Sequence, residues 1–246
     1  MREAKPGDPG DVVATAGPRP EEASAAMILV HGRGGTAEAM LGLWAALDLP
    51  GLAALAPQAA GNAWYPASFL APIEQNEPAL TAALAVLDRL IEGLGATGVP
   101  AARVIVLGFS QGACLGLEFV GRNPRRYGGV AGLSGGLIGP PGTPRDYPGS
   151  FAGTPVFLGC SDRDPHIPRE RVAETAAVFG RMGAAVEERI YPGLGHTVNE
   201  DELERVREMA SALLAPRPGG APRPGDSPRP GDSPRPGGLS PPRARR

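Results

Sequence analysis

Residues 104–119 have the sequence VIVLGFSQGACLGLEF, in which a short apolar run leads through two glycines into a helix-forming segment. This order predicts a buried strand, a sharp turn and a helix, with Ser110 at the apex of the turn. Such a turn strains the backbone of the serine, so the positions occupied by Gly108 and Gly112 must be small. The turn also places the N–H of Gln111 at the start of a helix, where it can donate to a developing oxyanion. We therefore predict that Ser110 is a nucleophile.

A second Gly-x-Ser-x-Gly pattern occurs at residues 132–136, again after a strand candidate. The residues that follow it, Leu137-Ile138-Gly139-Pro140-Pro141, cannot form a helix. Ser134 therefore lacks the strand–turn–helix context and is interpreted as a turn residue at the end of a strand.

Strands and helices alternate along the rest of the chain. Short apolar runs typical of strands buried on both faces occur at Ala26–Val30, Leu52–Ala56, Val104–Phe109, Gly129–Leu133, Pro155–Gly159 and Val186–Tyr191. The alternation predicts an α/β fold with a mostly parallel central sheet and helices on both faces. Ligands of such sheets bind beyond the carboxyl ends of the strands, so the residues there are the candidate site.

Three helices are predicted from apolar residues at helical spacing. Their apolar positions are Leu80, Leu84, Leu87, Ile91 and Leu94 after Pro78; Val172, Ala176, Phe179 and Met182 after Pro168; and Leu203, Val206, Ala210 and Leu213 within residues 200–214. Asn199 can cap the last helix, with Glu202 three residues later in the position of a capping box.

A serine nucleophile needs a base, usually a histidine held by a carboxylate. The chain has three histidines, and the order expected along this architecture is serine, acid, histidine. His31 precedes Ser110, and His166 lies too close in sequence to the best acid candidates. His196, in the Gly-rich segment between the last strand and the last helix, is the predicted base.

The acid is expected after the strand at residues 155–159, where Asp162 and Asp164 are the candidates. Spacing alone leaves the choice between them open.

The loop His31-Gly32-Arg33-Gly34-Gly35 follows the first predicted parallel strand. It matches the His-Gly-rich loop that supplies the second oxyanion N–H in α/β-hydrolases, and by position that N–H belongs to Arg33. A phosphate-binding loop is disfavoured, because the Gly-Lys-Ser/Thr and dinucleotide spacings are missing.

Composition separates the two ends of the chain from its body. Residues 1–24 are rich in Pro, Gly and Glu and are expected to be a loose leader. Residues 215–246 contain ten Pro, six Gly and seven Arg, in four copies of a Pro-Arg-Pro-Gly unit, and are predicted to be a disordered tail. The intervening residues 25–214 suffice for one domain.

The body without its basic tail is acidic, which argues against nucleic-acid binding. No secretory signal or long apolar run occurs, so we expect no stable membrane insertion. Cys114 and Cys160 are then expected to be reduced, buried thiols.

Together these motifs resemble the phospholipase/carboxylesterase family of α/β-hydrolases, which includes the acyl-protein thioesterases. The resemblance covers about residues 25–214 and rests on His31-Gly32-x-Gly34, residues 108–112, Asp164-Pro165-His166-Ile167-Pro168 and Gly195-His196. The family's Asp-x-x-Val/Ile-Pro signature falls on Asp164, which the resemblance therefore favours as the acid.

The resemblance implies an α/β-hydrolase fold with no large cap domain, a cytoplasmic location, no cofactor or metal, and hydrolysis of carboxylic esters or thioesters. The expected partner is a small acyl ester, and a homodimer is compatible with the sequence. Arg33 and the segment at residues 63–70 depart from the thioesterase pattern and are closer to bacterial carboxylesterases.

An apolar acyl pocket is predicted around the segment Ala63–Leu70. Its wall would be formed by Trp64, Tyr65, Phe69 and Leu70, although ordinary packing under a long loop explains these residues equally well.

The sequence thus favours a serine hydrolase that acts on short to medium acyl esters, with lysophospholipids or thioesters as further substrates. The alternative is a catalytically silent hydrolase-fold protein that binds a partner through its basic Pro-rich tail.

Overall fold

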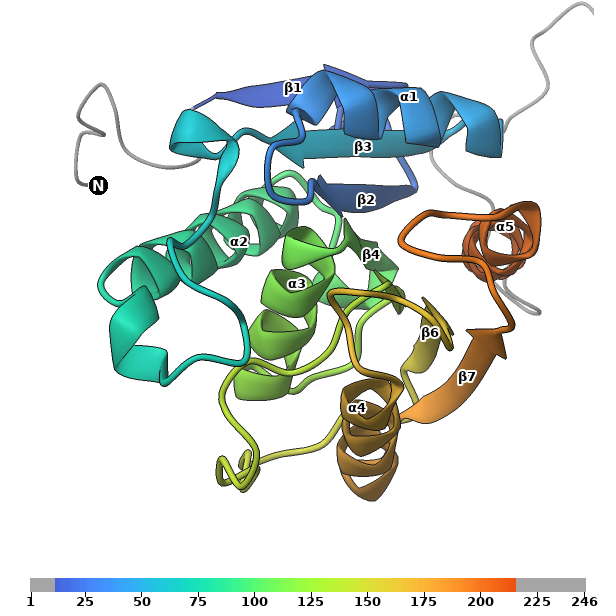
Figure 1. Cartoon of the computed structure of the whole chain (residues 1–246). Helices are drawn as coiled ribbons and strands as arrows, with labels where there is room; N and C mark the ends of the chain where they lie inside the picture. The colour runs from blue at the N-terminus through green and yellow to red at the C-terminus, as the bar shows by residue number, and fades with distance from the viewer. Residues whose placement is uncertain (1–11, 216–246) are drawn as a thin grey trace, which may run out of the picture. The chain divides into compact units, whose positions relative to one another are not determined.

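The structure is a computed structural model that describes residues 12–215. Its centre is a seven-stranded sheet in the order β1-β3-β2-β4-β5-β6-β7 (Figure 1). The strands are β1 (Val13–Ala16), β2 (Ala25–Val30), β3 (Leu52–Pro57), β4 (Val104–Phe109), β5 (Gly129–Leu133), β6 (Pro155–Ser161) and β7 (Ala185–Tyr191). All neighbours are parallel except β1, which pairs antiparallel with β3.

The predicted strands are confirmed, whereas the prediction that residues 1–24 form a loose leader is wrong in part. Residues 13–16 form β1, with Val13 opposite Pro57 and Ala16 opposite Ala54. The loose leader is predicted from the Pro, Gly and Glu content of residues 1–24, and the four residues of β1 give too short a pattern to indicate a strand within it. Their pairing depends on β3, which lies far along the chain. The predicted tail lies outside the described residues apart from Ala215.

Five α-helices and three short 3₁₀ helices accompany the sheet within residues 12–215. The α-helices are α1 (Ala37–Leu47), α2 (Ala79–Ala96), α3 (Gln111–Arg122), α4 (Arg169–Arg181) and α5 (Glu200–Leu214); the 3₁₀ helices are Ala60–Asn62, Ile73–Asn76 and Ala101–Arg103. The predicted capping box of α5 is present, since Glu202 N donates to Asn199 Oδ1 at 3.0 Å and Asn199 N donates to Glu202 Oε2 at 2.8 Å.

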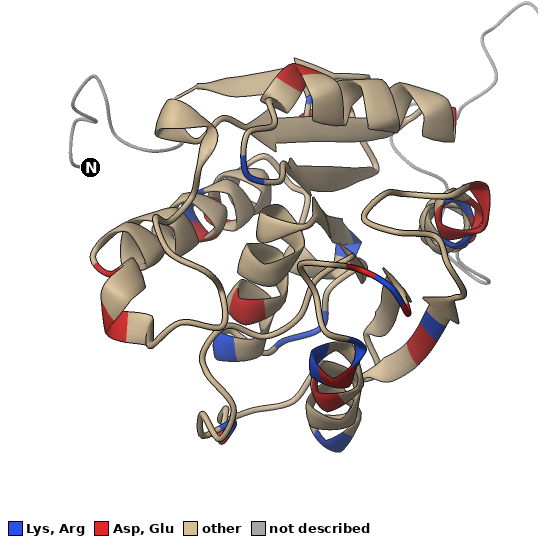
Figure 2. Cartoon of the chain, viewed as in Figure 1, with Lys and Arg blue, Asp and Glu red and all other residues tan. Residues whose placement is uncertain are grey.

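The helices cover both faces of the sheet, as predicted. Alternate residues of each central strand point to opposite faces. In β2, Ile28 and Val30 join a core formed with α2, α3 and α4, while Met27 and Leu29 join a second core formed with α1 and α5. Strands β2 to β6 contain no charged residue, so the charges lie on the helices, the loops and the edge strand β7 (Figure 2).

The parallel arrangement brings the carboxyl ends of β2, β4, β6 and β7 to one edge of the sheet. The segments that follow these strands contain the loop at residues 31–35, Ser110, Asp164 and His196. No cap domain interrupts the sheet and helices of residues 12–215.

Candidate active site

Ser110 lies in the turn between β4 and α3, with a left-handed backbone (φ 55°, ψ −120°). The two flanking glycines permit this turn because their close neighbours are backbone atoms. A Cβ at Gly108 would lie 2.4 Å from the carbonyl oxygen of Gly112, and a Cβ at Gly112 would lie 2.1 Å from that of Val30. The N–H of Ser110 donates to Leu133 O at 2.9 Å, which fixes the turn to β5.

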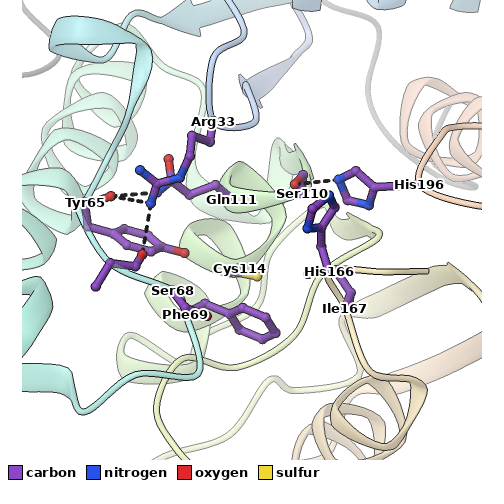
Figure 3. A pocket seen from close by; sticks show the side chains of 11 residues that line it. Arg33, Tyr65, Ser68, Phe69, Ser110, Gln111, Cys114, His166, Ile167 and His196 are labelled. Carbon is purple, nitrogen blue, oxygen red and sulfur yellow. Dashed lines mark hydrogen bonds between the residues drawn. The ribbon is translucent and has the colours of Figure 1, made fainter.

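A chain of short contacts joins Ser110, His196 and Asp164. His196 Nε2 lies 2.8 Å from Ser110 Oγ (Figure 3), and His196 Nδ1 lies 2.7 Å from Asp164 Oδ2. A carboxylate accepts only, so the neutral ring has its proton on Nδ1 and leaves Nε2 to accept from the serine hydroxyl. This arrangement orients the imidazole of His196 toward the hydroxyl of half-buried Ser110 at the turn between β4 and α3.

The Asp164 carboxylate is fully buried and held by its own loop. Asp164 Oδ1 accepts from the N–H of His166 at 2.8 Å and from that of Ile167 at 3.0 Å. Burial alone would raise the pKa of this carboxyl. The hydrogen bonds from His196 and from the two backbone N–H groups outweigh burial and lower the pKa below its usual value. Asp164 is therefore charged when it meets His196.

Asp162, the other acid candidate, supports the loop of His196 instead. Its Oδ1 accepts from Gly193 N at 2.7 Å, and the neighbouring Ser161 Oγ accepts from Gly195 N at 2.9 Å. Of the two acid candidates, Asp164 is therefore the one in contact with the ring of His196.

The two other histidines occupy different surroundings. His31 is buried, and burial lowers its pKa. Its Nδ1 donates to Gly32 O at 2.8 Å, and its Nε2 accepts from Ala59 N at 3.1 Å. His166 is exposed and packs edge-on against His196, with ring centroids 4.8 Å apart.

Ser134 shares the left-handed backbone of Ser110 (φ 50°) but not its setting. It is fully buried, and its N–H donates to Gly159 O at 2.7 Å. The residues after it form no helix, as predicted, and it is not among the residues that line the cavity beside Ser110.

The loop at residues 31–35 lies beside the nucleophile, because a Cβ at Gly32 would be 3.1 Å from Ser110 Cβ. Its turn is fixed by Gly34 (φ 76°), whose N–H donates to Asn62 O at 2.7 Å. Within residues 12–215, the backbone N–H groups of Arg33 and Gln111 donate to no protein acceptor. These are the two N–H groups that the sequence indicates as oxyanion donors.

A cavity of about 360 Å³ opens beside Ser110 and His196 (Figure 3). Eleven residues line it: Arg33, Tyr65, Ala67, Ser68, Phe69, Ser110, Gln111, Cys114, His166, Ile167 and His196. Tyr65 and Phe69 of the predicted wall are among them. Trp64 and Leu70, which were also expected there, are not.

Trp64 and Leu70 pack into the protein instead. Trp64 is buried beneath the loop, and its Nε1 donates to His31 O at 2.8 Å. Leu70 is partly buried against the core that includes α2, α3 and α4. An irregular loop has no periodicity that indicates which side chains face inward, so the sequence does not separate these two from Tyr65 and Phe69.

Side-chain hydrogen bonds hold the pocket wall in place. Gln111 Oε1 accepts from Trp64 N at 3.0 Å, and Gln111 Nε2 donates to Tyr65 O at 2.8 Å. Arg33 Nη2 donates to Tyr65 O at 2.7 Å and to Ala67 O at 2.9 Å. Buried Asn76 accepts a hydrogen bond from Ala67 N and donates one to Ser68 O.

The sequence analysis missed several residues of the pocket. Cys114 lies one helical turn after Ser110, so its spacing on α3 was a usable signal. His166 and Ile167 follow Asp164 within its tight turn and come to the pocket with it. Cys114 and Cys160 are both free and buried, as predicted, and burial raises the pKa of each thiol to about 12.

Residues 12–215 contain neither a cluster of metal-ligating side chains nor a helix that could span a membrane. No group of three or more His, Cys, Asp or Glu side chains is arranged to hold a metal ion there. No helix in this part of the chain is both long and apolar enough to cross a membrane.

Comparisons with known proteins agree with this fold. A bacterial phospholipase/carboxylesterase from Dyadobacter fermentans has 43% sequence identity and a TM-score of 0.78, over 82% of this chain and 96% of that chain. Acyl-protein thioesterase 1 of Debaryomyces hansenii is 32% identical over 43% of this chain and 46% of its own length. Acyl-protein thioesterase 1 of Gibberella zeae is 29% identical over 49% and 52%. The chain thus spans about half the length of these two relatives.

The family model described as phospholipase/carboxylesterase matches residues 13–214, which include β1 and every residue of the candidate site. The chain belongs to the phospholipase/carboxylesterase family.

Proposed function

We propose that this protein is a serine hydrolase that cleaves carboxylic esters with short to medium acyl chains. The observation that carries the proposal is the contact chain from Ser110 Oγ to His196 Nε2 (2.8 Å) and from His196 Nδ1 to Asp164 Oδ2 (2.7 Å). A neutral imidazole between a hydroxyl and a buried carboxylate is an arrangement that turns serine into a nucleophile. Membership of an esterase family and the resemblance to acyl-protein thioesterases support the same chemistry.

In the first half of the reaction, Ser110 Oγ attacks the acyl carbonyl carbon while its proton passes to His196 Nε2. The charge that develops on the carbonyl oxygen is stabilised by the N–H groups of Arg33 and Gln111, which donate to no other acceptor in the described part of the chain. Asp164 stabilises the imidazolium. The tetrahedral intermediate then collapses, and His196 gives its proton to the leaving alcohol or thiol, which departs and leaves Ser110 acylated.

In the second half, a water molecule gives a proton to His196 and attacks the acyl carbon. The same two N–H groups stabilise the second oxyanion, the acid leaves, and the proton returns to Ser110 Oγ. A cavity of about 360 Å³ with Tyr65, Phe69 and Ile167 in its wall suits an acyl chain of short to medium length. Lysophospholipids and thioesters would follow the same steps.

Labelling with a fluorophosphonate probe tests this proposal. The probe phosphonylates activated serines, and peptide mass spectrometry identifies the modified residue. We expect labelling at Ser110 in the wild-type chain, none in Ser110→Ala, and a loss of ester turnover by about 10⁶ in kcat in that variant.

Ser134→Ala is the matched control, because Ser134 lies in the other Gly-x-Ser-x-Gly pattern with a similar backbone. It should retain both labelling and turnover. Folded wild-type protein that is not labelled at Ser110 would contradict the proposal.

The alternative, a binding protein that acts through the basic tail, concerns residues almost wholly outside the described part of the chain. Deletion of residues 215–246 separates the two functions, since the esterase keeps its turnover without them. A cytoplasmic location and a homodimer stay predictions.

A further inference from the structure

Arg33 is a cation that lines the cavity of the candidate active site and has no carboxylate partner among the described residues. Among the residues that line the cavity there is no Asp or Glu. Arg33 Nη2 donates to two backbone carbonyls, those of Tyr65 and Ala67. Carbonyl oxygens accept hydrogen bonds from the guanidinium but do not neutralise its charge. The pocket therefore keeps a positively charged side chain in its wall.

Arg33 is exposed, whereas two arginines of this chain with buried side chains, Arg145 and Arg171, are neutralised by a carboxylate. Arg145 lies 3.3 Å from Glu174 Oε1, and Arg171 Nε lies 2.8 Å from Glu174 Oε2. Within residues 12–215, Arg33 has no Asp or Glu oxygen within 4.0 Å. Its Nη1 and Nε donate to no described acceptor, so three N–H donors are available to a ligand.

The place of Arg33 indicates which part of a substrate it would meet. The leaving group must lie next to His196, because that ring returns the proton to it. Figure 3 shows Arg33 and Tyr65 on one side of the pocket and Ser110 and His196 on the other. An acyl chain attached to Ser110 and directed away from His196 therefore extends toward Arg33.

The guanidinium of Arg33 is also held in place before a ligand binds. Two carbonyls fix Nη2, so little side-chain entropy is lost when an anion binds the remaining donors. The pairing of guanidinium with carboxylate is favoured by its charge and planar geometry.

We propose that Arg33 binds a carboxylate at the far end of the acyl group, so that the preferred substrates are monoesters of dicarboxylic acids. The inference rests on the proposed esterase function and names the class of acid it releases. Arg33 is a specificity-determining residue: its backbone N–H serves the oxyanion, and its side chain selects the acyl group.

The test compares two esters with the same leaving group. One is the mono-para-nitrophenyl ester of adipic acid, and the other is the neutral analogue in which a methyl ketone replaces the terminal carboxylate. Wild-type kcat/KM should be at least about tenfold higher for the anionic ester, the worth of one hydrogen bond between charged groups. The preference should shrink at about 1 M salt, where the screening length falls to about 3 Å.

Variants separate the charge of Arg33 from its structural contacts. Arg33→Gln keeps a donor for the wall carbonyls but has no charge, and should lower kcat/KM for the anionic ester at least about tenfold more than for the neutral ester, so that the preference is lost. Arg33→Lys keeps the charge and should retain part of the preference. Arg126→Gln is the matched control, since exposed Arg126 also donates to a backbone carbonyl, that of Ala152 at 3.0 Å, and does not line the pocket.

The wild-type protein alone already decides the main point: equal rates for the two esters overturn the inference. So does a fall in Arg33→Gln that is equal for both esters, because that result assigns Arg33 to the support of the wall. A charge preference that is found only when the carboxylate is placed on the alcohol part overturns the acyl-side placement.

Fluorophosphonate labelling of Ser110 distinguishes a failure of this inference from a failure of the proposed function. If Ser110 is labelled and the neutral ester is hydrolysed, only the role of Arg33 has failed; if Ser110 is not labelled, both have.

Discussion

Gly112 lies so close to Val30 that a Cβ on the glycine would be 2.1 Å from the carbonyl oxygen of Val30. Gly112 belongs to the first turn of α3, and Val30 is the last residue of β2. The turn that carries Ser110 and the loop that begins at His31 are therefore in direct backbone contact. Their separation, and with it the distance between the N–H groups of Arg33 and Gln111, depends on the lack of a side chain at this position.

We therefore expect Gly112→Ala to lower the free energy of unfolding by at least about 2 kcal/mol, since the methyl group meets backbone that cannot move aside cheaply. Fluorophosphonate labelling of any folded variant should also slow, because the turn and the loop move apart. Denaturant unfolding measures the first effect and the labelling rate measures the second.

Gly93→Ala is the control for this prediction. Gly93 is exposed on α2, where a Cβ would meet nothing within 4 Å, so the change should be neutral or stabilise the protein by up to about 1 kcal/mol. Similar effects at the two glycines would contradict the explanation by contact.

Asp164→Asn should lower kcat by about 10⁴, because an amide no longer stabilises the imidazolium or selects its Nδ1–H tautomer. KM should change much less, since Asp164 lies behind His196 and is not among the residues that line the pocket. Steady-state kinetics with a para-nitrophenyl ester measures both constants.

Asp162→Asn is the paired variant, because Asp162 contacts the N–H of Gly193 and not the ring of His196. Its kcat should stay within about tenfold of wild type. The reverse order of effects would assign the acid to Asp162.

The carboxyl of Glu202 should make the free energy of unfolding depend on pH. Its carboxyl is fully buried on α5, and its Oε1 has no hydrogen-bond partner. Burial raises its pKa from 4.5 to about 7; the charge of Asp201 adds to this effect and the N–H of Asn199 opposes it. Between these two pH values the native state holds a proton that the unfolded chain has released. The free energy of unfolding should therefore decrease as pH rises from 4.5 to 7, by at most about 3 kcal/mol from this group.

Glu202→Gln should remove this part of the pH dependence, as measured by urea unfolding between pH 4.5 and 8. Glu204→Gln, at an exposed position of the same helix, should keep the wild-type slope. Identical slopes for wild type and Glu202→Gln would show that Glu202 is not the group responsible.

Phe69→Ala should shift the preference toward longer acyl chains, because it removes a ring from the pocket wall. We expect the ratio of kcat/KM for a longer to a shorter ester to rise by about tenfold or more. Leu70→Ala, next in sequence but absent from the wall, should leave the ratio unchanged. A thermal melt checks that both variants are folded, and equal shifts in the ratio would contradict the assigned wall.

The parts of the fold that could be predicted are those with local signals. Continuous apolar runs indicated the central strands, and helical spacing indicated α2, α4 and α5. Ser110, His196 and the loop with the two acid candidates could be placed together because parallel strands end at one edge, so that chain order places their loops. The choice of Asp164 over Asp162 came from the family resemblance and not from chain order.

The parts that could not be predicted depend on partners distant in sequence. Strand β1 exists through its pairing with β3, and four residues of its own carry too little pattern. Trp64 faces the core rather than the pocket because its indole N–H reaches the carbonyl of His31. The guanidinium of Arg33 is directed by the carbonyls of Tyr65 and Ala67, and nothing in the loop at residues 31–35 indicates those acceptors.

The carbonyl oxygen of Tyr65 accepts from the side chains of both Arg33 and Gln111, at 2.7 and 2.8 Å. The same two residues carry the N–H groups that would polarise the substrate carbonyl. Evolution of a new acyl specificity in this scaffold is therefore constrained. A change of backbone path at position 65 would release two side chains at once and disturb the proposed oxyanion donors. Side-chain replacements at Phe69 or Ser68 leave that carbonyl in place, so they can reshape the pocket without moving the two proposed donors.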